Sequence, residues 1–223
     1  FAFLDRWGVP YATLNIDAPT SRRRAFVGVD HAAEGRLAAD FLATGARRGA
    51  LVAVVSGLPR RATTLAGADI AAERFEGCRE VARRAGLRCR LVEIDTTADA
   101  GSESVRRALE SERRLAGVYL MTADPTIVKE TAAATRAPIV ASSASPEFLE
   151  MLRAGSLGAI VYQNPVLQGY YAVRALEHLL EGSHDGAGSQ QPQRVVLVYN
   201  LLLRENIDLP DNHQLFVGSV PGG

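Results

Sequence analysis

Short apolar runs alternate with amphipathic segments along almost the whole chain. Runs of strand length occur at residues 11–16, 25–29, 50–55, 88–94, 117–121, 138–142, 158–162 and 195–203. Segments with helical spacing separate them, at residues 32–44, 69–85, 102–112, 125–135, 146–154 and 165–181. Strands that are apolar on both faces need helices on both sides, so this order predicts an α/β fold with parallel sheets flanked by helices.

The composition excludes several classes of protein. Of the 223 residues, 47% are hydrophobic, enough for a sizeable core, and 25 basic residues balance 25 acidic ones. A formal charge of zero gives no global attraction for nucleic acid, and no apolar run reaches the ~20 residues that a membrane span needs. Cys78 and Cys89 fall in a predicted helix and a predicted strand, so we expect reduced thiols rather than a disulfide.

The motifs of common catalytic sites are absent from the sequence. No glycine-rich phosphate loop and no G-x-S-x-G motif follows a strand, and no Cys/His spacing suits a metal ion. The four histidines are scattered over different predicted elements, which argues against a histidine-centred catalytic group. We therefore expect no enzyme, no cofactor and no metal site.

Polar residues follow most of the predicted strands. They lie at positions 17, 30, 56, 95, 122–124, 142–145 and 163–164. The carboxyl ends of parallel strands meet at one edge of a sheet, where α/β proteins bind ligands. The last of these positions, Gln163-Asn164, precedes Pro165, so Asn164 is suited to cap the following helix while proline fills its first turn.

Six segments in order resemble the effector-binding domain of the LacI family of bacterial regulators. They are similar in the same way to the periplasmic sugar-binding proteins, and the resemblance covers residues 11–210. The segments read VGVDHAAEGRLAADFLATGARR, ALVAVVSG, AAERFEGCREVARRAG, GVYLMTADPTIVKETA, GAIVYQNPVLQGYYAVRAL and LLLRENIDLP.

The resemblance implies a two-lobed periplasmic-binding-protein type I fold with a ligand in the cleft between the lobes. One lobe would contain residues 30–163 and 194–210, and the other residues 1–29 and 164–193, with residues 211–223 as a tail. The chain would cross between lobes near residue 30, near residues 163–164 and within residues 182–194. About two βα units, ~60 residues, would precede Phe1, so the N-terminal lobe is expected to be incomplete in this chain.

The resemblance also implies which residues touch the ligand. Asp30 matches a polar position that binds ligand hydroxyls, with helix capping as the alternative. Arg74 matches an arginine that points into the cleft, with a surface ion pair to a glutamate as the alternative. Gln163 matches a carboxamide contact, with capping as the alternative. Asp30, Gln163 and Asn164 are the expected hinge residues.

Two further expected contacts depart from the usual pattern. Sugar-binding relatives often have asparagine before the aspartate at the position of Asp124, where this chain has Ala123, and they often have aspartate where this chain has Ser143. Asp124 suits a helix cap before Pro125 better than a direct contact. We therefore expect either a ligand that is less hydroxylated than a typical sugar or one held by groups from the missing part of the N-terminal lobe.

The resemblance leads to a cytoplasmic LacI-type regulator as the first functional hypothesis. It would bind a sugar-like effector, act as a homodimer and reach operator DNA through a helix-turn-helix headpiece outside this sequence. The alternative is a periplasmic sugar-binding protein of an ABC uptake transporter. An α/β enzyme using the same cleft is a third possibility, for which the sequence offers no catalytic pair.

Overall fold

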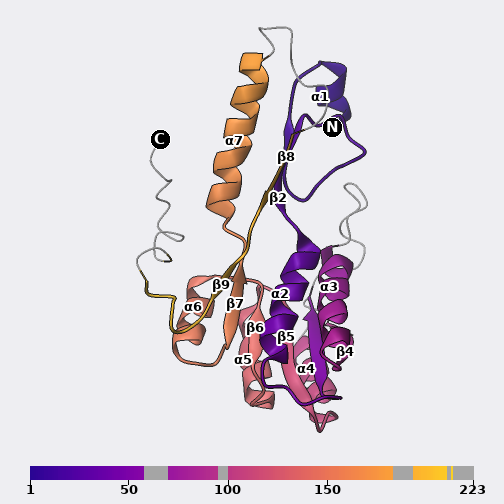
Figure 1. Cartoon of the computed structure of the whole chain (residues 1–223), viewed down its shortest axis with the longest axis vertical. Helices are drawn as coiled ribbons and strands as arrows, with labels where there is room; N and C mark the ends of the chain where they lie inside the picture. The colour runs from indigo at the N-terminus through magenta and orange to yellow at the C-terminus, as the bar shows by residue number, and fades with distance from the viewer. Residues whose placement is uncertain (58–69, 95–99, 183–192, 210–211, 213–223) are drawn as a thin grey trace.

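Two sheets meet end to end in the computed structural model, which describes residues 1–57, 70–94, 100–182, 193–209 and 212 (Figure 1). The larger sheet has the strand order β4 (Arg88–Glu93), β3 (Leu51–Ser56), β5 (Leu115–Met121), β6 (Ile139–Ala141), β7 (Ala159–Tyr162) and β9 (Asn200–Leu202). The smaller has the order β1 (Ala12–Asn15), β2 (Ala25–Val29) and β8 (Gln193–Leu197). Every pairing is parallel except that of β7 with β9, so the predicted α/β fold is confirmed.

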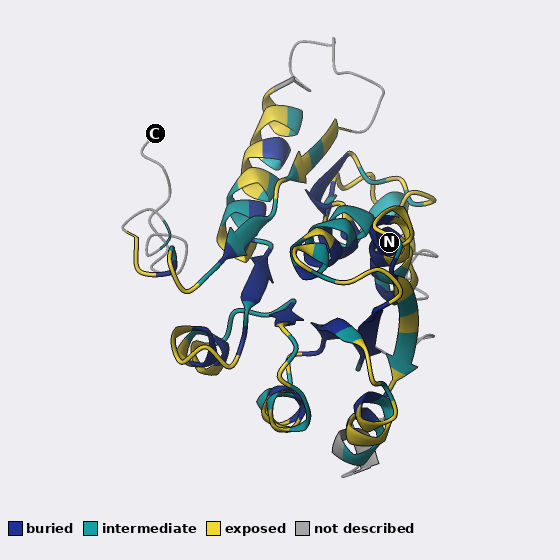
Figure 2. Cartoon of the chain, turned by 60° about the horizontal axis from the view of Figure 1, so that its bottom comes forward, coloured by how far each residue is buried: buried dark blue, intermediate teal, exposed yellow. Residues whose placement is uncertain are grey.

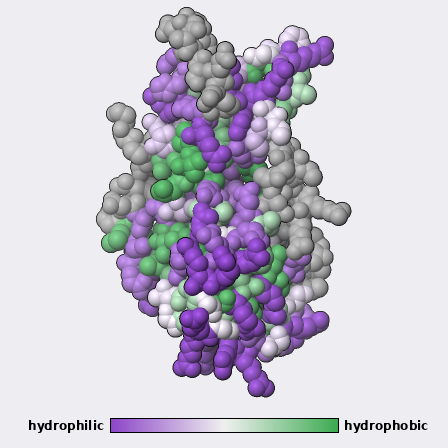
Figure 3. Space-filling view, turned by 45° about the vertical axis from the view of Figure 1, so that its right-hand side comes forward, coloured by the Kyte–Doolittle hydropathy of each residue, from purple (hydrophilic) through white to green (hydrophobic). Residues whose placement is uncertain are grey.

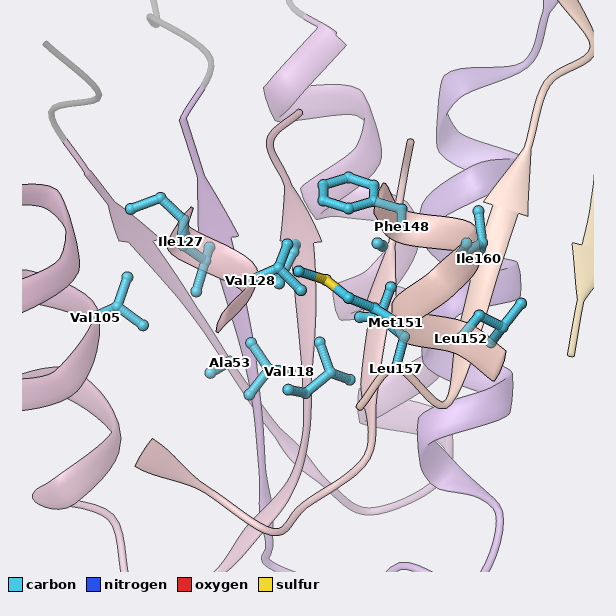
Figure 4. Close-up of a cluster of buried hydrophobic side chains, with 14 of the residues drawn as sticks. Ala53, Val105, Val118, Ile127, Val128, Phe148, Met151, Leu152, Leu157 and Ile160 are labelled. Carbon is cyan, nitrogen blue, oxygen red and sulfur yellow. The ribbon is translucent and has the colours of Figure 1, made fainter. Parts of the chain in front are cut away.

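Helices cover both faces of the larger sheet. Two of them, α2 (His31–Ala43) and α3 (Ile70–Arg84), pack on one face, and three others, seen nearly end-on in Figure 2, line the opposite face. These three are α4 (Ala100–Glu110), α5 (Pro125–Ala134) and α6 (Pro146–Arg153). In Figure 4, Val118 of the sheet, Ile127 of α5 and Phe148 of α6 project into one apolar layer, and all three are buried. This core explains why the inner strands β3, β5, β6 and β7 have no polar face, whereas the edge strand β4 has exposed polar residues.

Fewer helices pack against the smaller sheet than against the larger one. The helix α7 (Pro165–Gly182) packs on one of its faces, where Ala175 contacts Ala25 and Val27. A short helix not predicted from the sequence, α1 (Ala2–Arg6), lies near this sheet and buries none of its residues. Leu14 of β1 and Val196 of β8 are both exposed. Seen from the side, hydrophobic residues gather on the surface in separate groups between hydrophilic ones (Figure 3).

The chain crosses three times between the sheets. Two crossings, at residues 29–31 and 162–165, fall near the expected positions. The third was expected within residues 182–194 but lies at residues 198–199, because β8 pairs with β2 of the smaller sheet and only β9 joins the larger one. The apolar run 195–203 had been predicted as one strand, and it contains no glycine or proline to mark the break. The expected tail, residues 211–223, lies outside the described residues except for Asn212.

Close contact between α2 and α3 depends on two glycines. A Cβ atom added at Gly35 would overlap the backbone carbonyl of Arg74, and one at Gly77 would overlap that of Ala32. Neither carbonyl can move without shifting its helix. The two helices therefore approach more closely than any larger side chain would allow. No helix in the described part of the chain is long and apolar enough to span a lipid bilayer.

We predict that Gly35→Ala destabilises the protein by ~1–3 kcal/mol, because the added methyl group must push α2 away from α3. Gly169→Ala is the matched control: Gly169 also lies within a helix, but nothing approaches its Cβ position within 4 Å. That variant should be neutral or slightly stabilising, since alanine is the better helix former. Urea unfolding of the three proteins measures the difference, and equal stability of Gly35→Ala and the parent protein would disprove the constraint.

Candidate functional site

The three crossings lie together at the junction of the sheets, next to the carboxyl ends of the strands. Tyr162 pairs with Asn200, so Gln163 and Tyr199, the next residues outward on the two strands, lie close together. Asp30 and Tyr199 line one groove of about 290 Å³ with Leu37 and residues 196–198. Residues far apart in the sequence thus meet where α/β proteins bind ligands.

A buried ion pair forms one wall of the junction. Glu34 of α2 and Arg74 of α3 are only 1% and 7% exposed, and their Oε2 and Nη2 atoms lie 2.6 Å apart. The Tyr119 hydroxyl of β5 donates to Glu34 Oε1 at 2.8 Å, and Ser142 Oγ after β6 donates to the Tyr119 oxygen at 3.1 Å. Four elements are therefore linked through side chains in the interior.

The charges of this network shift the pKa values of its side chains. Burial is the largest single influence on Arg74 and would lower its pKa, but the Glu34 carboxylate, Tyr119 and Tyr199 together outweigh burial and raise the pKa. Burial and the same carboxylate raise the pKa of Tyr119 well above its ordinary value. Arg74 therefore stays charged and Tyr119 stays a neutral hydrogen-bond donor, which is the state that the observed geometry requires.

His31 lies buried beside this network. Burial and the positive charge of Arg74 lower the pKa of His31 to about 4, although the Asn15 backbone and the Asp30 carboxylate act in the opposite direction. Neither ring nitrogen makes a hydrogen bond of normal geometry. The side chain is therefore a neutral imidazole with unused donor and acceptor capacity at neutral pH.

The unpaired buried side-chain atoms of the described residues gather at this junction. They are Asn15 Oδ1, both ring nitrogens of His31, Arg74 Nε, Gln163 Oε1 and the Tyr199 hydroxyl, with Glu34 Oε2 held only by its ion pair to Arg74. The Tyr199 hydroxyl faces the Glu34 carboxylate without reaching hydrogen-bonding geometry, and burial raises its pKa. Folded proteins pair most buried polar groups, so a cluster of exceptions marks a place where a partner is missing.

Backbone strain accompanies these unpaired groups. Asn15 has φ +64° and Asn164 has φ +43°, and no other non-glycine residue in the described ranges has a positive φ. Asparagine tolerates this region better than most residues, but such conformations concentrate at functional sites. Asn15 ends β1 and Asn164 follows β7, so both flank the junction.

Two of the predicted contact residues are helix caps in the structure. Asp30 Oδ1 accepts a hydrogen bond from the backbone N–H of Ala33 at 3.0 Å, and Asp30 Oδ2 accepts one from Arg36 at 3.1 Å. Asp124 accepts from the N–H of Thr126 at 2.8 Å, as its place before Pro125 predicted. Each carboxylate still has lone pairs for another donor.

The other predicted residues take different positions. Arg74 is not in the surface ion pair considered from the sequence but in the buried one with Glu34. Gln163 is half-buried, and its backbone oxygen accepts from Gln168 Nε2 at 2.8 Å. Asn164 Oδ1 caps α7 by accepting from the N–H of Leu167 at 3.0 Å. Ser143 is half-buried in the segment that follows β6.

Sequence reasoning missed Asn15, His31 and Tyr199. At the end of the first strand it singled out Asp17, but that carboxylate forms an ion pair with Arg23, whose Nη2 donates to it at 2.9 Å. The available signals were an asparagine closing an apolar run and a histidine directly after the cap residue Asp30. Tyr199 carried no signal because it lay inside a predicted strand.

Similarity to known proteins assigns this chain to a family. The family described as "Periplasmic binding protein domain" matches residues 4–184. The chain belongs to this periplasmic binding protein family. It is a non-enzymatic family with the type I fold, in agreement with the predictions from the sequence. A search of curated proteins found no match. In the described ranges, no group of three His, Cys, Asp or Glu side chains is arranged to hold a metal ion.

Several solved structures share the fold of this periplasmic binding protein. GanP, a glucose-galactose binding protein from Geobacillus stearothermophilus, is 24% identical with a TM-score of 0.73, over 93% of this chain and 71% of GanP. A periplasmic ribose ABC transporter structure from Conexibacter woesei is 24% identical with a TM-score of 0.75, over 92% and 67%. A putative LacI transcriptional regulator from Bacteroides fragilis is 16% identical with a TM-score of 0.74, over 92% of this chain and 70% of that protein.

We predict that His31 makes stability depend on pH between about 4 and 6.5. Its pKa is about 4 in the native state and 6.5 when unfolded, so the unfolded chain binds more protons in that range. The resulting stability is complete above pH 6.5 and is lost as the pH falls to 4, by up to about 3 kcal/mol. Urea unfolding at several pH values measures it.

His31→Gln should flatten this pH dependence relative to the parent protein. The control is His178→Gln, because His178 lies exposed on α7 and its replacement should leave the curve unchanged. If His31→Gln and the parent protein lost the same stability on acidification, the buried neutral imidazole would be excluded as the cause.

Proposed function

We propose that the chain is the ligand-binding domain of a LacI-type transcriptional regulator and that it holds a sugar-like molecule at the junction of its two sheets. The observation that carries this proposal is the cluster of unpaired buried polar atoms on Asn15, His31, Arg74 and Gln163. Leaving such groups without partners costs about 1–3 kcal/mol each, and a ligand that pairs with them recovers much of that cost.

The chemistry of the cluster favours a neutral, hydroxyl-rich ligand. Asn15 Oδ1 and Gln163 Oε1 accept hydrogen bonds, Arg74 Nε donates, and the neutral His31 ring can do both. A sugar hydroxyl donates and accepts at once, so neighbouring hydroxyls can satisfy donors and acceptors together. GanP is described as a glucose-galactose binding protein, which is consistent with this ligand class.

The proposed contacts are Asp30, Arg74, Asp124, Ser143 and Gln163, with Asn15 and His31 added from the structure. Asp30 and Asp124 keep their capping bonds and use their free lone pairs, so neither needs to release its helix. Arg74 keeps its ion pair through Nη2 and offers Nε. Binding therefore needs no rearrangement of the buried network.

Ligand binding would work by closing one lobe on the other. The proposed smaller lobe is built on residues 1–29 and 164–193, and the larger on residues 30–163 and 194–210, with β8 extending the smaller lobe to residue 197. Asp30, Gln163 and Asn164 are the proposed hinge, and the positive φ of Asn164 supports that role. A ligand shifts such an equilibrium only by its difference in affinity for the two states.

The regulator would couple closure to operator DNA through a headpiece outside this sequence, as a homodimer in the cytoplasm. The similarity in fold to the Bacteroides fragilis protein supports this reading, whereas the segment LLLRENIDLP is compatible with both candidates. The second candidate is an exported sugar-binding protein of an ABC transporter. The Conexibacter woesei structure and GanP support that reading.

The gene sequence upstream of the codon for Phe1 separates these two candidates. A helix-turn-helix segment in the same reading frame is the expected result, and the encoded full-length protein should then retard a DNA fragment from its own promoter region in a gel-shift assay. A signal peptide followed by further βα units would instead identify the transport protein and exclude the regulator.

We predict that Gln163→Ala and Asn15→Ala each weaken binding of a sugar identified by thermal-shift screening. The loss should be about 5- to 150-fold in Kd, or ~1–3 kcal/mol, because each change strands the ligand hydroxyl that the carboxamide had paired. Isothermal titration calorimetry measures the Kd.

Gln193→Ala is the matched control, because Gln193 carries the same side chain but is exposed at the far end of β8. Its affinity should equal that of the parent protein. Unchanged affinity in both Gln163→Ala and Asn15→Ala would place the ligand elsewhere and overturn the proposed site.

A further inference from the structure

Two thiols lie together outside the junction. Cys78 on α3 and Cys89 on β4 are separated by a tight turn at Gly86, which folds the helix back along the strand. Their sulfur atoms share a hydrogen bond of 3.8 Å, and both residues are free thiols. Ten residues of chain, 79–88, separate them.

We propose that Cys78 and Cys89 are a reversible oxidation site at which a disulfide links α3 to β4. A disulfide bond is about 2.05 Å long, so the sulfurs need to approach by less than 2 Å, on the order of what small side-chain rotations provide. Because the turn already holds helix and strand together, the backbone need not move far. The site is independent of the proposed ligand and of the junction.

The two thiols are not equally accessible. Cys78 is fully buried between α3 and the sheet, whereas Cys89 is half-buried and lines a surface groove of about 610 Å³ with Arg79, Glu76 and Leu87. An oxidant can therefore reach Cys89 first. Cys89 is the attacking thiol and Cys78 the one that completes the bond.

The electrostatics agree with this order of attack. The hydrogen bond shared with Cys78 and the Arg79 guanidinium lower the pKa of Cys89, although burial and the Glu76 carboxylate act in the opposite direction. The same hydrogen bond, together with burial, raises the pKa of Cys78. The accessible sulfur is thus the better thiolate, and the thiolate is the reactive form.

The chemistry is thiol–disulfide exchange with a small-molecule disulfide such as oxidised glutathione. The Cys89 thiolate attacks one glutathione sulfur, which forms a mixed disulfide and releases one glutathione thiolate. Cys78 then gives up its proton and attacks the Cys89 sulfur, which releases the second. Two protein thiols are oxidised by two electrons, and one glutathione disulfide is reduced to two thiols that take up the two protons.

Intact-mass spectrometry of the purified protein after incubation with oxidised glutathione tests the proposal. The expected product has lost the mass of two hydrogens, carries no glutathione and does not react with a maleimide until dithiothreitol is added. Peptide mapping should link the peptides that contain Cys78 and Cys89. Amide hydrogen exchange should slow in residues 78–84 of the oxidised protein, because the cross-link removes local opening of the end of α3.

Two variants check the order of attack. Cys78→Ser should stop at a stable glutathione adduct on Cys89, and Cys89→Ser should remain unmodified under the same conditions. The mass and the peptide map of the parent protein test the proposed disulfide even if a variant fails to fold. Two free thiols after prolonged oxidation, or glutathione adducts without an internal disulfide, would overturn the proposal.

Discussion

The buried ion pair between Glu34 and Arg74 is the interaction on which the rest of the junction depends. Removing two charges from water is expensive, and the 2.6 Å contact together with the Tyr119 hydrogen bond offsets that cost. The pair can form in the interior because Gly35 and Gly77 let α2 and α3 approach backbone to backbone. Since α2 begins at the first crossing between the sheets, fixing α2 against α3 also fixes the wall along which His31 and Asp30 lie.

Stability and binding make opposite demands at this junction. A protein optimised only for stability would pair or remove the polar atoms that Asn15, His31 and Gln163 leave unsatisfied. The Glu34–Arg74 ion pair and its hydrogen bond to Tyr119 supply rigidity, so the unpaired groups, Arg74 Nε among them, are held in place without collapsing onto each other. Preorganised groups of this kind lose little freedom when a ligand binds, which is why such a site can be tight as well as selective.

The sequence predicted most of the architecture because the signals were local. Apolar runs of strand length, proline at the start of α5, α6 and α7, and capping side chains such as Asn164 all act within a few residues. It failed where a choice depended on distant partners. The run 195–203 contains one clearly polar residue, Asn200, but no glycine or proline, and only pairing with β2 and β7 divides it into β8 and β9. Asp17 was named as the polar residue after the first strand because that strand was predicted to run to residue 16, whereas β1 ends at Asn15 and Asp17 is neutralised by Arg23.

The sequence by itself determined that this chain is an α/β protein of the periplasmic binding protein family. Strand and helix periodicity and the order of the motifs can be read along the chain without knowledge of the fold. Tertiary structure alone decided which polar residues are paired and which are left over. Arg74 and Gln163 were expected at the site, but whether a guanidinium is free or neutralised depends on Glu34, forty residues away along the chain. Hydrogen bonds and ion pairs act over a few ångströms in space, and only folding brings their partners within that distance.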